Sequence, residues 1–331
     1  MSALHIEDLH VHYHGGEQPL QAVAGCSIRI EAGHTLGLVG ESGCGKSTLG
    51  MAIMGLLPPS ATLRARQALL HGKQLFDAHG QVPRQLRGRH IAMVFQDPMT
   101  SLNPYLSIEQ HFRTPLREHL RLGRSAARER ACSLLTQVGI PDPQMRLCRY
   151  PHEFSGGQRQ RIGIALALSC DPSVLIADEP TTALDVTIQA QILRLLQDLQ
   201  QQRNLALLLI THDLGVVAQS CQRTMVMYAG SCVEEAPTQR LLSQPAHPYT
   251  KALLGAVPGG TQRPGSRLTN IPGLPPRLHQ TAQHCPFAPR CPQAEPRCQQ
   301  QHPPLYDIAP QHHAACLLLQ APQTAAPSAG L

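Results

Sequence analysis

The sequence contains no tryptophan, and aromatic residues make up only 3% of its 331 residues. Proteins that bind nucleic acid usually present clustered basic residues, and those that bind single strands add aromatic stacking platforms. The net charge of +6 comes here from basic residues scattered along the chain. We therefore expect no nucleic-acid partner, although such a basic surface is compatible with a position close to anionic lipid.

The chain also lacks an apolar run of the ~20 residues that a membrane-spanning helix needs. Its longest strongly apolar stretches are residues 162–168 and 205–210. Residues 1–8 include acidic side chains and no apolar signal core, which predicts that the chain is not secreted. We expect a cytoplasmic protein whose membrane role, if it has one, depends on a partner.

Disulfides are not expected in that reducing compartment, although the chain has eleven cysteines. Seven cysteines are dispersed, and small, mostly buried residues are the simplest interpretation for each of them. The other four, Cys285, Cys291, Cys298 and Cys316, gather in a Pro-rich tail. Four thiolates that converge in such a tail can hold zinc or an iron-sulfur cluster, which would fold it. Unmetallated thiols are the alternative.

What the chain does contain is a phosphate-binding loop pattern, G-x-x-x-x-G-K-[ST], between an apolar strand and a helix. The strand is predicted at residues 36–39 and the helix at 47–57. Glycines allow the tight turn, backbone N–H groups close around the phosphates, and the helix directs its positive end at them. Lys46 would neutralise the β- and γ-phosphates, and the Ser47 hydroxyl would ligate Mg²⁺. The loop consists of Gly40, Glu41, Ser42, Gly43, Cys44, Gly45, Lys46 and Ser47, with Thr48 next.

Periodicity along the chain predicts an α/β fold with three parts. A β-rich start and a later alternation of strands and helices indicate a mostly parallel sheet covered by helices. Between them, residues 97–169 favour an inserted helical subdomain, with helices at 107–120, 125–139 and 158–168. After residue 257 the composition shifts to Pro, Gln, His and Cys, which indicates a separate appendage. We expect an ATP-binding core at 1–96 and 170–256, the helical subdomain at 97–169 and a C-terminal extension at 257–331.

Two carboxylates end the apolar strand at residues 174–177. Asp178 could hold Mg²⁺, directly or through water, and Glu179 could orient and polarise the attacking water. Gln96 follows the strand at 91–95 and could reach a metal-bound or attacking water. His212 follows the strand at 205–210, at the carboxyl end where ligands bind in such sheets. Taken alone, Gln96 could be a surface residue and His212 a structural one.

A second anion site is predicted where a helix begins at residues 154–158. Free backbone amides and the helix dipole would point outward there, although an ordinary helix cap with flexible glycines has the same pattern. The segment is Phe154, Ser155, Gly156, Gly157 and Gln158.

These motifs, in this order, resemble those of ATP-binding cassette (ABC) transporter ATPases over about residues 4–256. The resemblance implies a P-loop NTPase core with an antiparallel β subdomain and an inserted helical subdomain. It also implies that two cassettes pack head to tail, so that the Phe154–Gln158 segment of one closes over the γ-phosphate bound to the other. Phe154 stands where the family has Leu, a change that spares the Ser155 and backbone contacts with phosphate.

The resemblance also assigns roles by position. Glu179 would be the catalytic base, His212 the γ-phosphate switch and Gln96 the residue that senses metal and water. Asp185, in the segment Thr182-Ala183-Leu184-Asp185, would link the two cassettes. Tyr13 looks like the aromatic residue that stacks on adenine, unless it is an edge-strand tyrosine.

Three further segments resemble the ATPase subunits of dipeptide and oligopeptide importers: residues 96–104, 247–250 and 271–276. This implies a heterodimer with a second ABC ATPase, two integral membrane permeases, and an extracytoplasmic solute-binding protein that acts indirectly. The chain would be peripheral at the cytoplasmic face of the bacterial inner membrane. Residues 97–108 would dock the permease coupling helix, unless they form a solvated loop.

The spacing of the tail cysteines resembles the C-terminal extension of these importers, where some members carry a [4Fe-4S] cluster. Zinc is the alternative ligand, and His284, His312 and His313 would allow a mixed ligand set. Three functions remain open at this stage: import of peptides or of nickel and other metal chelates, a soluble cassette that acts on DNA or ribosomes, and regulation of the ATPase by the tail metal.

Overall fold

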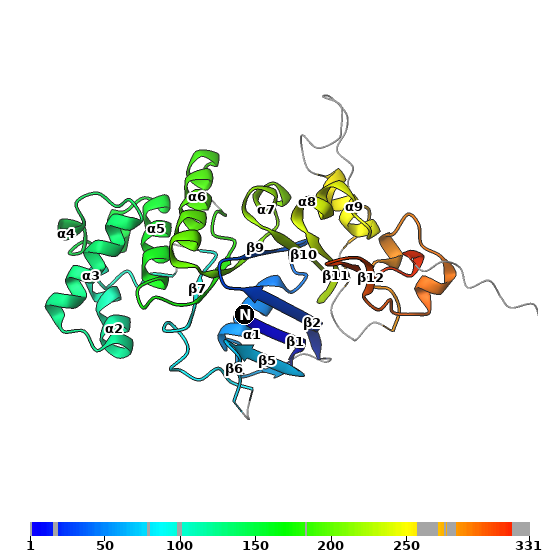
Figure 1. Ribbon diagram of the computed structural model, residues 1–331, viewed down its shortest axis with the longest axis horizontal. Coiled ribbons are helices and arrows are strands. Elements are labelled where there is room, and N and C mark those ends of the chain that lie inside the picture. The colour runs from blue at the N-terminus through cyan, green and yellow to red at the C-terminus, as the bar shows by residue number, and fades with distance from the viewer. Residues whose placement is uncertain are drawn as a thin grey trace, which may run out of the picture.

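A computed structural model describes residues 2–15, 19–77, 80–97, 101–182, 184–256, 271–274, 276 and 283–319. Within these residues it contains two sheets with helices on both sides of the larger one (Figure 1). The expected α/β architecture is confirmed. None of the helices in these ranges is long and apolar enough to cross a bilayer.

The smaller sheet is antiparallel and has the order β2-β1-β5-β6, with β4 paired to β1. This is the antiparallel β subdomain that the sequence predicted. Its strands are β1 (Ser2–Tyr13), β2 (Leu20–Glu31), β4 (Ala61–Arg64), β5 (Gln67–Leu70) and β6 (Lys73–Gln74).

The larger sheet has the order β12-β13-β11-β10-β3-β9-β8-β7. From β10 to β7 every pair is parallel, as predicted, whereas β11, β13 and β12 add an antiparallel edge. Its strands are β3 (Thr35–Val39), β7 (Ile91–Val94), β8 (Val174–Asp178), β9 (Ala206–Thr211), β10 (Arg223–Tyr228), β11 (Ser231–Pro237), β12 (Tyr306–Ala309) and β13 (His312–Ala314).

Helices cover this sheet on both faces, and the buried strands alternate between two cores. In β9, Leu208 and Ile210 pack toward α1 and the smaller sheet, while Leu207 and Leu209 pack toward α6 and α7. Each such buried leucine or isoleucine contributes about 1.5–3 kcal/mol. The helices are α1 (Lys46–Met54), α2 (Ile108–Leu120), α3 (Arg124–Gln137), α4 (Pro143–Arg146), α5 (Gly156–Ala167), α6 (Val186–Arg203), α7 (Leu214–Ser220), α8 (Thr238–Ser243) and α9 (Pro248–Gly255), with short 3₁₀ turns η1 (Pro151–Glu153), η2 (Ala288–Arg290), η3 (Pro296–Gln299) and η4 (Leu317–Leu319).

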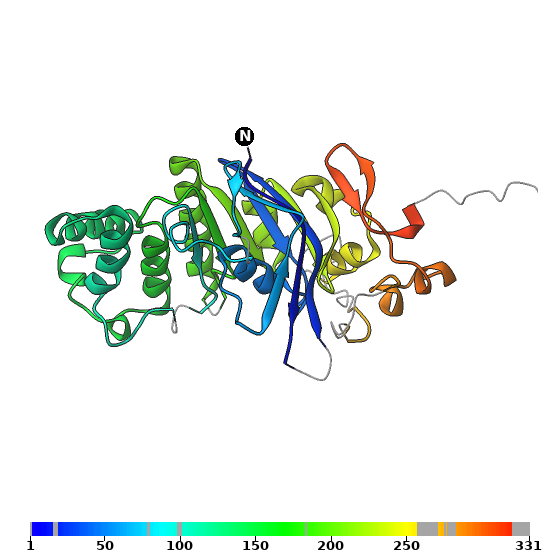
Figure 2. The same cartoon turned by 90° about the horizontal axis from the view of Figure 1, so that it is seen from below.

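Helices α2 to α5 form one end of the molecule, and residues 283–319, hereafter the tail, form the other end (Figures 1 and 2). The three predicted helices of the helical part are present within two residues of their expected bounds. Ser107 begins α2 with a capping box, in which its hydroxyl accepts from Gln110 N while its own N–H donates to the Gln110 side chain.

The tail, for which composition suggested a separate appendage, is joined to the larger sheet. Its strand β13 pairs with β11, so the tail extends the larger sheet. Glu234 on β11 is fully buried and accepts hydrogen bonds from Ala246 N, His247 N and His312 Nε2 at 2.7–2.9 Å. Because a buried carboxylate without partners would be very costly, these bonds fix the tail strand and the approach to α9 against the sheet.

Candidate functional site

The predicted phosphate loop joins β3 to α1 at the carboxyl edge of the larger sheet (Figure 1). Lys46 begins α1, and its side chain is buried. Its Nζ donates to the carbonyl oxygens of Gly40 at 2.8 Å and Glu41 at 2.9 Å. The lysine charge is thus held by the loop's own carbonyls, at the place where an anionic ligand can replace them.

Glycine is required at Gly45 of this loop. Its φ of 104° lies in the left-handed region, and an added Cβ would sit 2.2 Å from the carbonyl oxygen of Ala22. Gly43 has a φ of 79° but open space around the Cβ position.

We expect Gly45→Ala to destabilise the fold by about 2–4 kcal/mol, which combines backbone strain with overpacking. Gly43→Ala is the matched control, because it suffers the strain alone and should cost about 1–2 kcal/mol. Urea unfolding of both variants measures the difference. Equal losses would mean that the Ala22 contact is not a constraint.

A hydroxyl and a carboxylate face each other beside the loop. The Ser47 hydroxyl donates to Asp178 Oδ1 at 3.1 Å, across the gap between α1 and the end of β8. Burial raises the pKa of Asp178, with a smaller opposing effect from Ser47. Hard oxygen donors of this kind suit Mg²⁺, and a cation would relieve the cost of burying this carboxylate.

Glu179 is the centre of a hydrogen-bond network at the same edge. Its Oε2 accepts from Gln96 Nε2 at 2.9 Å and from Thr182 Oγ1 at 2.8 Å, and its Oε1 lies 3.1 Å from His212 Nδ1. The structure therefore brings together Gln96, Glu179 and His212, which the sequence singled out separately. Their strands, β7, β8 and β9, are neighbours in the sheet.

The network also tunes the acidity of Glu179. Burial alone would raise its pKa, but the bonds from Thr182 and His212 outweigh burial and lower the pKa from its ordinary value. The carboxylate is therefore ionised at neutral pH, as a base must be. Its φ of 44° is a left-handed conformation that costs about 1–3 kcal/mol for a residue other than glycine, and such strain is typical of functional sites.

Tyr13 ends β1 and lies beside the first turn of α1. Its hydroxyl donates to Thr48 Oγ1 at 3.4 Å, and its side chain is half-buried. Tyr13 is therefore close to the phosphate loop, and its stacking on adenine stays a prediction.

The segment at 154–158 caps α5, as predicted for a helix start. Ser155 Oγ accepts from Gln158 N at 3.3 Å, and Ser155 N donates to Gln158 Oε1 at 3.1 Å. An added Cβ at Gly157 would lie 2.8 Å from Ile188 Cγ2, so the glycine allows α5 to approach the start of α6. Phe154 is buried below this turn.

Helix α5 belongs to the helical end of the molecule, whereas α1, which follows the phosphate loop, lies near the centre of the molecule (Figure 1). The two predicted phosphate sites are thus apart within one chain. Asp185 caps α6 by accepting from Ile188 N at 2.9 Å. Its neighbour Val186 is 83% exposed, which leaves an apolar side chain in solvent next to the predicted dimer link. Ala183 of the same segment lies outside the described residues.

The tail cysteines do not form a metal centre in the described residues, where no three His, Cys, Asp or Glu side chains are arranged to hold a metal ion. Their expected iron-sulfur or zinc site is therefore not supported. The thiols nevertheless affect one another electrostatically: burial, together with the nearby Cys298 and Cys316, raises the pKa of Cys285 to about 11.

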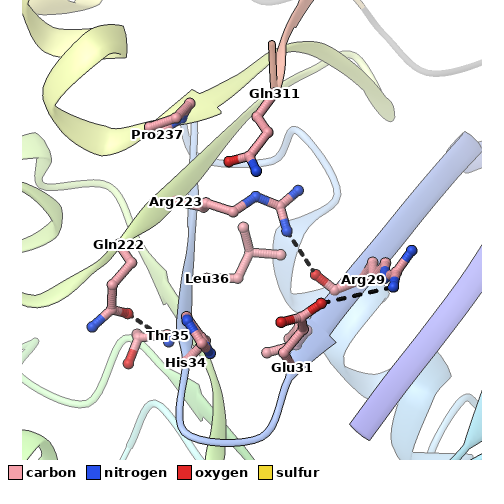
Figure 3. Close-up of a pocket in the computed structure, with 10 residues that line it drawn as sticks. Arg29, Glu31, His34, Thr35, Leu36, Gln222, Arg223, Pro237 and Gln311 are labelled. Atoms are coloured by element: carbon pink, nitrogen blue, oxygen red, sulfur yellow. Dashed lines mark hydrogen bonds and ion pairs between the residues drawn. The ribbon is translucent and has the colours of Figure 1, made fainter. Parts of the chain in front are cut away.

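One surface pocket lies at the opposite edge of the larger sheet from this site. Thr35 at the start of β3 and Arg223 at the start of β10 line it, and Arg223 donates to the carbonyl oxygen of Arg29 at 3.1 Å (Figure 3). Because the phosphate loop follows the other end of β3, this pocket is not part of the nucleotide site.

Residues that sequence reasoning missed surround Glu41 of the loop. Tyr249 accepts from Glu41 N, and Arg290 of the tail pairs with the Glu41 carboxylate. Residues 247–250 stood out only as a family segment, and nothing in the sequence linked Arg290 to the loop.

A phosphate loop between a parallel strand and a helix, with a Ser47–Asp178 pair and an acid held by Gln96 and His212, defines a P-loop ATPase. Comparison with known families specifies the class further. Residues 23–182 match the family described as ABC transporter, and residues 233–298 match the one described as oligopeptide/dipeptide transporter, C-terminal region.

Individual relatives give the same result. The chain is 48% identical over 314 residues to a probable peptide ABC transporter ATP-binding protein of Sinorhizobium fredii, covering 95% of this chain and 94% of the relative. It is 48% identical to a dipeptide transport ATP-binding protein of Bacillus subtilis, covering 95% and 94%, and 44% identical to one of Escherichia coli, covering 96% of each. The chain belongs to the ABC transporter family, in the branch with the oligopeptide/dipeptide C-terminal region.

Solved structures agree with this assignment. A dimeric post-hydrolysis ATP-binding cassette bound to ADP and Pi is 25% identical and superposes with a TM-score of 0.62, covering 71% of this chain and 98% of that chain. A cassette from Clostridium perfringens, part of an ABC transporter complex, gives 28% identity and a TM-score of 0.60, covering 73% and 91%.

Proposed function

We propose that this chain is the ATP-hydrolysing subunit that energises import of di- or oligopeptides through a pair of membrane permeases. The observation that carries the proposal is the placement of Glu179, ionised, bonded to Gln96 and His212, and next to the buried Asp178 beside the phosphate loop. The peptide-transport relatives and the matching C-terminal region support the substrate class.

In this proposal Lys46 releases the Gly40 and Glu41 carbonyls and donates to the β- and γ-phosphates of ATP. Ser47 and Asp178 would hold Mg²⁺, with Gln96 close by; when bound, the metal would neutralise charge that develops on the phosphates. Glu179 accepts a proton from the attacking water, and His212 and Gln96 keep the carboxylate and the water in line. Tyr13 would stack on the adenine.

We further propose that the site is completed by a second ABC ATPase subunit. The capped start of α5 carries helix N–H groups that can receive a γ-phosphate, yet it lies away from this chain's own loop. The partner's loop would receive Ser155, Gly156 and Gly157, and Asp185 would contact the partner across the junction. The dimeric state of the solved cassette supports this arrangement.

An apolar groove between the core and the helical part supports a permease partner. It has a volume of about 470 Å³ and is lined by Phe95, Leu102, Leu106 and His111, among others, between β7 and α5. Phe95 is 45% exposed, so a partner seated in the groove would remove this apolar side chain from water. Residues 98–100 of the predicted docking segment lie outside the described residues.

We expect Tyr105→Ala to weaken assembly with the permeases. Tyr105 is 88% exposed in this segment, and removing an aromatic anchor from an interface costs about 1–3 kcal/mol, or roughly 5–150-fold in affinity. Co-purification and peptide uptake measure the loss, while ATP binding by the isolated subunit should not change. Met145→Ala, at another exposed site of the helical part, is the control. Unchanged uptake in Tyr105→Ala would exclude this docking segment.

The substrate is tested by uptake in cells that lack this chain. Cells complemented with the wild type should regain uptake of labelled dipeptides, and cells complemented with Glu179→Gln should not. If the wild type restored uptake of nickel or another metal chelate but not of peptides, the proposed substrate would be the metal chelate instead of a peptide. The proposal also places the chain at the cytoplasmic face of the membrane, as a peripheral subunit served indirectly by an extracytoplasmic solute-binding protein.

We also propose the three-part division of the chain, with the core at 1–96 and 170–256, the helical subdomain at 97–169 and the extension at 257–331. No step of the proposed mechanism uses the tail cysteines, because the described residues do not bring three metal ligands together.

A further inference from the structure

The tail contacts the phosphate loop through one ion pair. Arg290 ends the short turn η2, and its two terminal nitrogens donate to the Glu41 carboxylate at 2.6 Å and 2.9 Å. Glu41 is the second residue of the loop, and 249 positions separate the two residues in the sequence. A two-pronged arginine–carboxylate pair fixes direction as well as distance.

Arg290 is itself held firmly. Its Nε donates to the carbonyl oxygen of Pro272 at 2.8 Å, and Nη1 also lies 3.3 Å from the Tyr228 hydroxyl. The side chain is only 5% exposed, and its bonds to Glu41, ahead of the opposing effect of burial, raise its pKa. All three nitrogens of this buried, permanently charged guanidinium donate hydrogen bonds, so its position is fixed. Because it is fixed, its ion pair with Glu41 restrains the phosphate loop.

A second contact restrains the backbone of the same residue. Glu41 N donates to the Tyr249 hydroxyl at 2.9 Å. Tyr249 and Tyr228 are buried, and Phe287 of the tail packs against both rings, with centroids 5.4 Å and 5.3 Å away. The carbonyl of Glu41 in turn accepts from Lys46. Glu41 therefore connects the tail to the lysine that the proposed function assigns to the phosphates.

We propose that Arg290 is a positioning residue for the nucleotide, through which the tail sets the ATP affinity of the cassette. Without the ion pair, the Glu41 backbone is still held by Tyr249 and Lys46, but the side chain is released and must be ordered again each time ATP binds. Ordering a released glutamate side chain costs about tenfold in affinity. Glu179, Gln96 and His212 make no contact with Arg290 in the bonds described, so hydrolysis of bound ATP is unaffected.

The inference rests on the proposed role of Lys46 and predicts a split between two kinetic constants. In the full chain, Arg290→Gln should raise KM and Kd for ATP about tenfold and leave kcat within about twofold, and Glu41→Gln should raise KM and Kd to the same extent. The double variant should be no worse than either single variant, because both remove the same pair. Arg290→Lys keeps the positive charge but cannot make the two-pronged contact with Glu41. It should therefore keep part of the ATP affinity that Arg290→Gln loses.

Arg297→Gln is the matched control, because Arg297 is a tail arginine whose ion pair among the described residues is local, with Glu295 at 2.7 Å. A purely structural role would lower the melting temperature of Arg290→Gln, and Glu41→Gln would then keep wild-type KM; that result overturns the inference. Additive effects in the double variant would also overturn it. If Glu179→Gln kept its turnover while the KM split appeared, the proposed catalytic base would be wrong and the positioning role would stand.

Discussion

Glu179→Gln is expected to reduce steady-state ATP turnover by roughly 10²–10⁴-fold, the usual contribution of a general base, while ATP still binds. Glutamine keeps the size of the side chain and an acceptor oxygen for Gln96 and Thr182. It loses the negative charge that accepts the proton of the attacking water. Phosphate release measures turnover, and titration with a fluorescent nucleotide measures binding.

The same variant should accumulate with ATP bound, because the step that empties the site is blocked. In the proposed heterodimer this would stabilise the closed form, which size-exclusion chromatography with ATP detects. Glu129→Gln is the control, since Glu129 is an exposed carboxylate on α3. If Glu179→Gln hydrolysed ATP at the wild-type rate, Glu179 would not be the catalytic base.

The local parts of this site could be predicted because their signals are local. The phosphate loop needs its glycines, Lys46 and Ser47 at fixed spacing, and the strand before it is a short apolar run. Asp178 and Glu179 stand directly after another such run. Gln96 and His212 were each singled out because they follow a strand. The structure brings both to Glu179, because the carboxyl ends of neighbouring parallel strands meet at one edge of the sheet.

The tail could not be predicted in the same way, because its partners are distant in sequence. Strand β11 contains Glu234, which looks like a solvent-exposed residue until His312, 78 positions later, bonds to it. Strands β12 and β13 are short segments whose ladder depends on β11. No periodic pattern in the sequence predicts the ion pair between Arg290 and Glu41. Cysteine spacing suggested a cluster, but spacing alone does not direct four thiols to one point.

Lys46→Ala is expected to weaken ATP binding by about 10²–10³-fold and to abolish turnover with it. Lys46 is only 5% exposed, and its charge is balanced by the Gly40 and Glu41 carbonyls. Removing it takes the cation away from the phosphates, a loss of about 3–4 kcal/mol for a buried charged pair. It also leaves two loop carbonyls without their donor, so the empty loop loses its shape.

Lys73→Ala separates this effect from a general loss of positive charge. Lys73 is an exposed lysine on β6, so its removal changes the net charge equally and should leave the Kd for ATP within about twofold. Calorimetric titration with ATP and Mg²⁺ measures both variants, and thermal unfolding without nucleotide shows whether the Lys46 variant is folded. A folded Lys46→Ala protein that binds ATP within threefold of the wild type would contradict the assignment. In that case the phosphates would be held by backbone amides and the start of α1 alone.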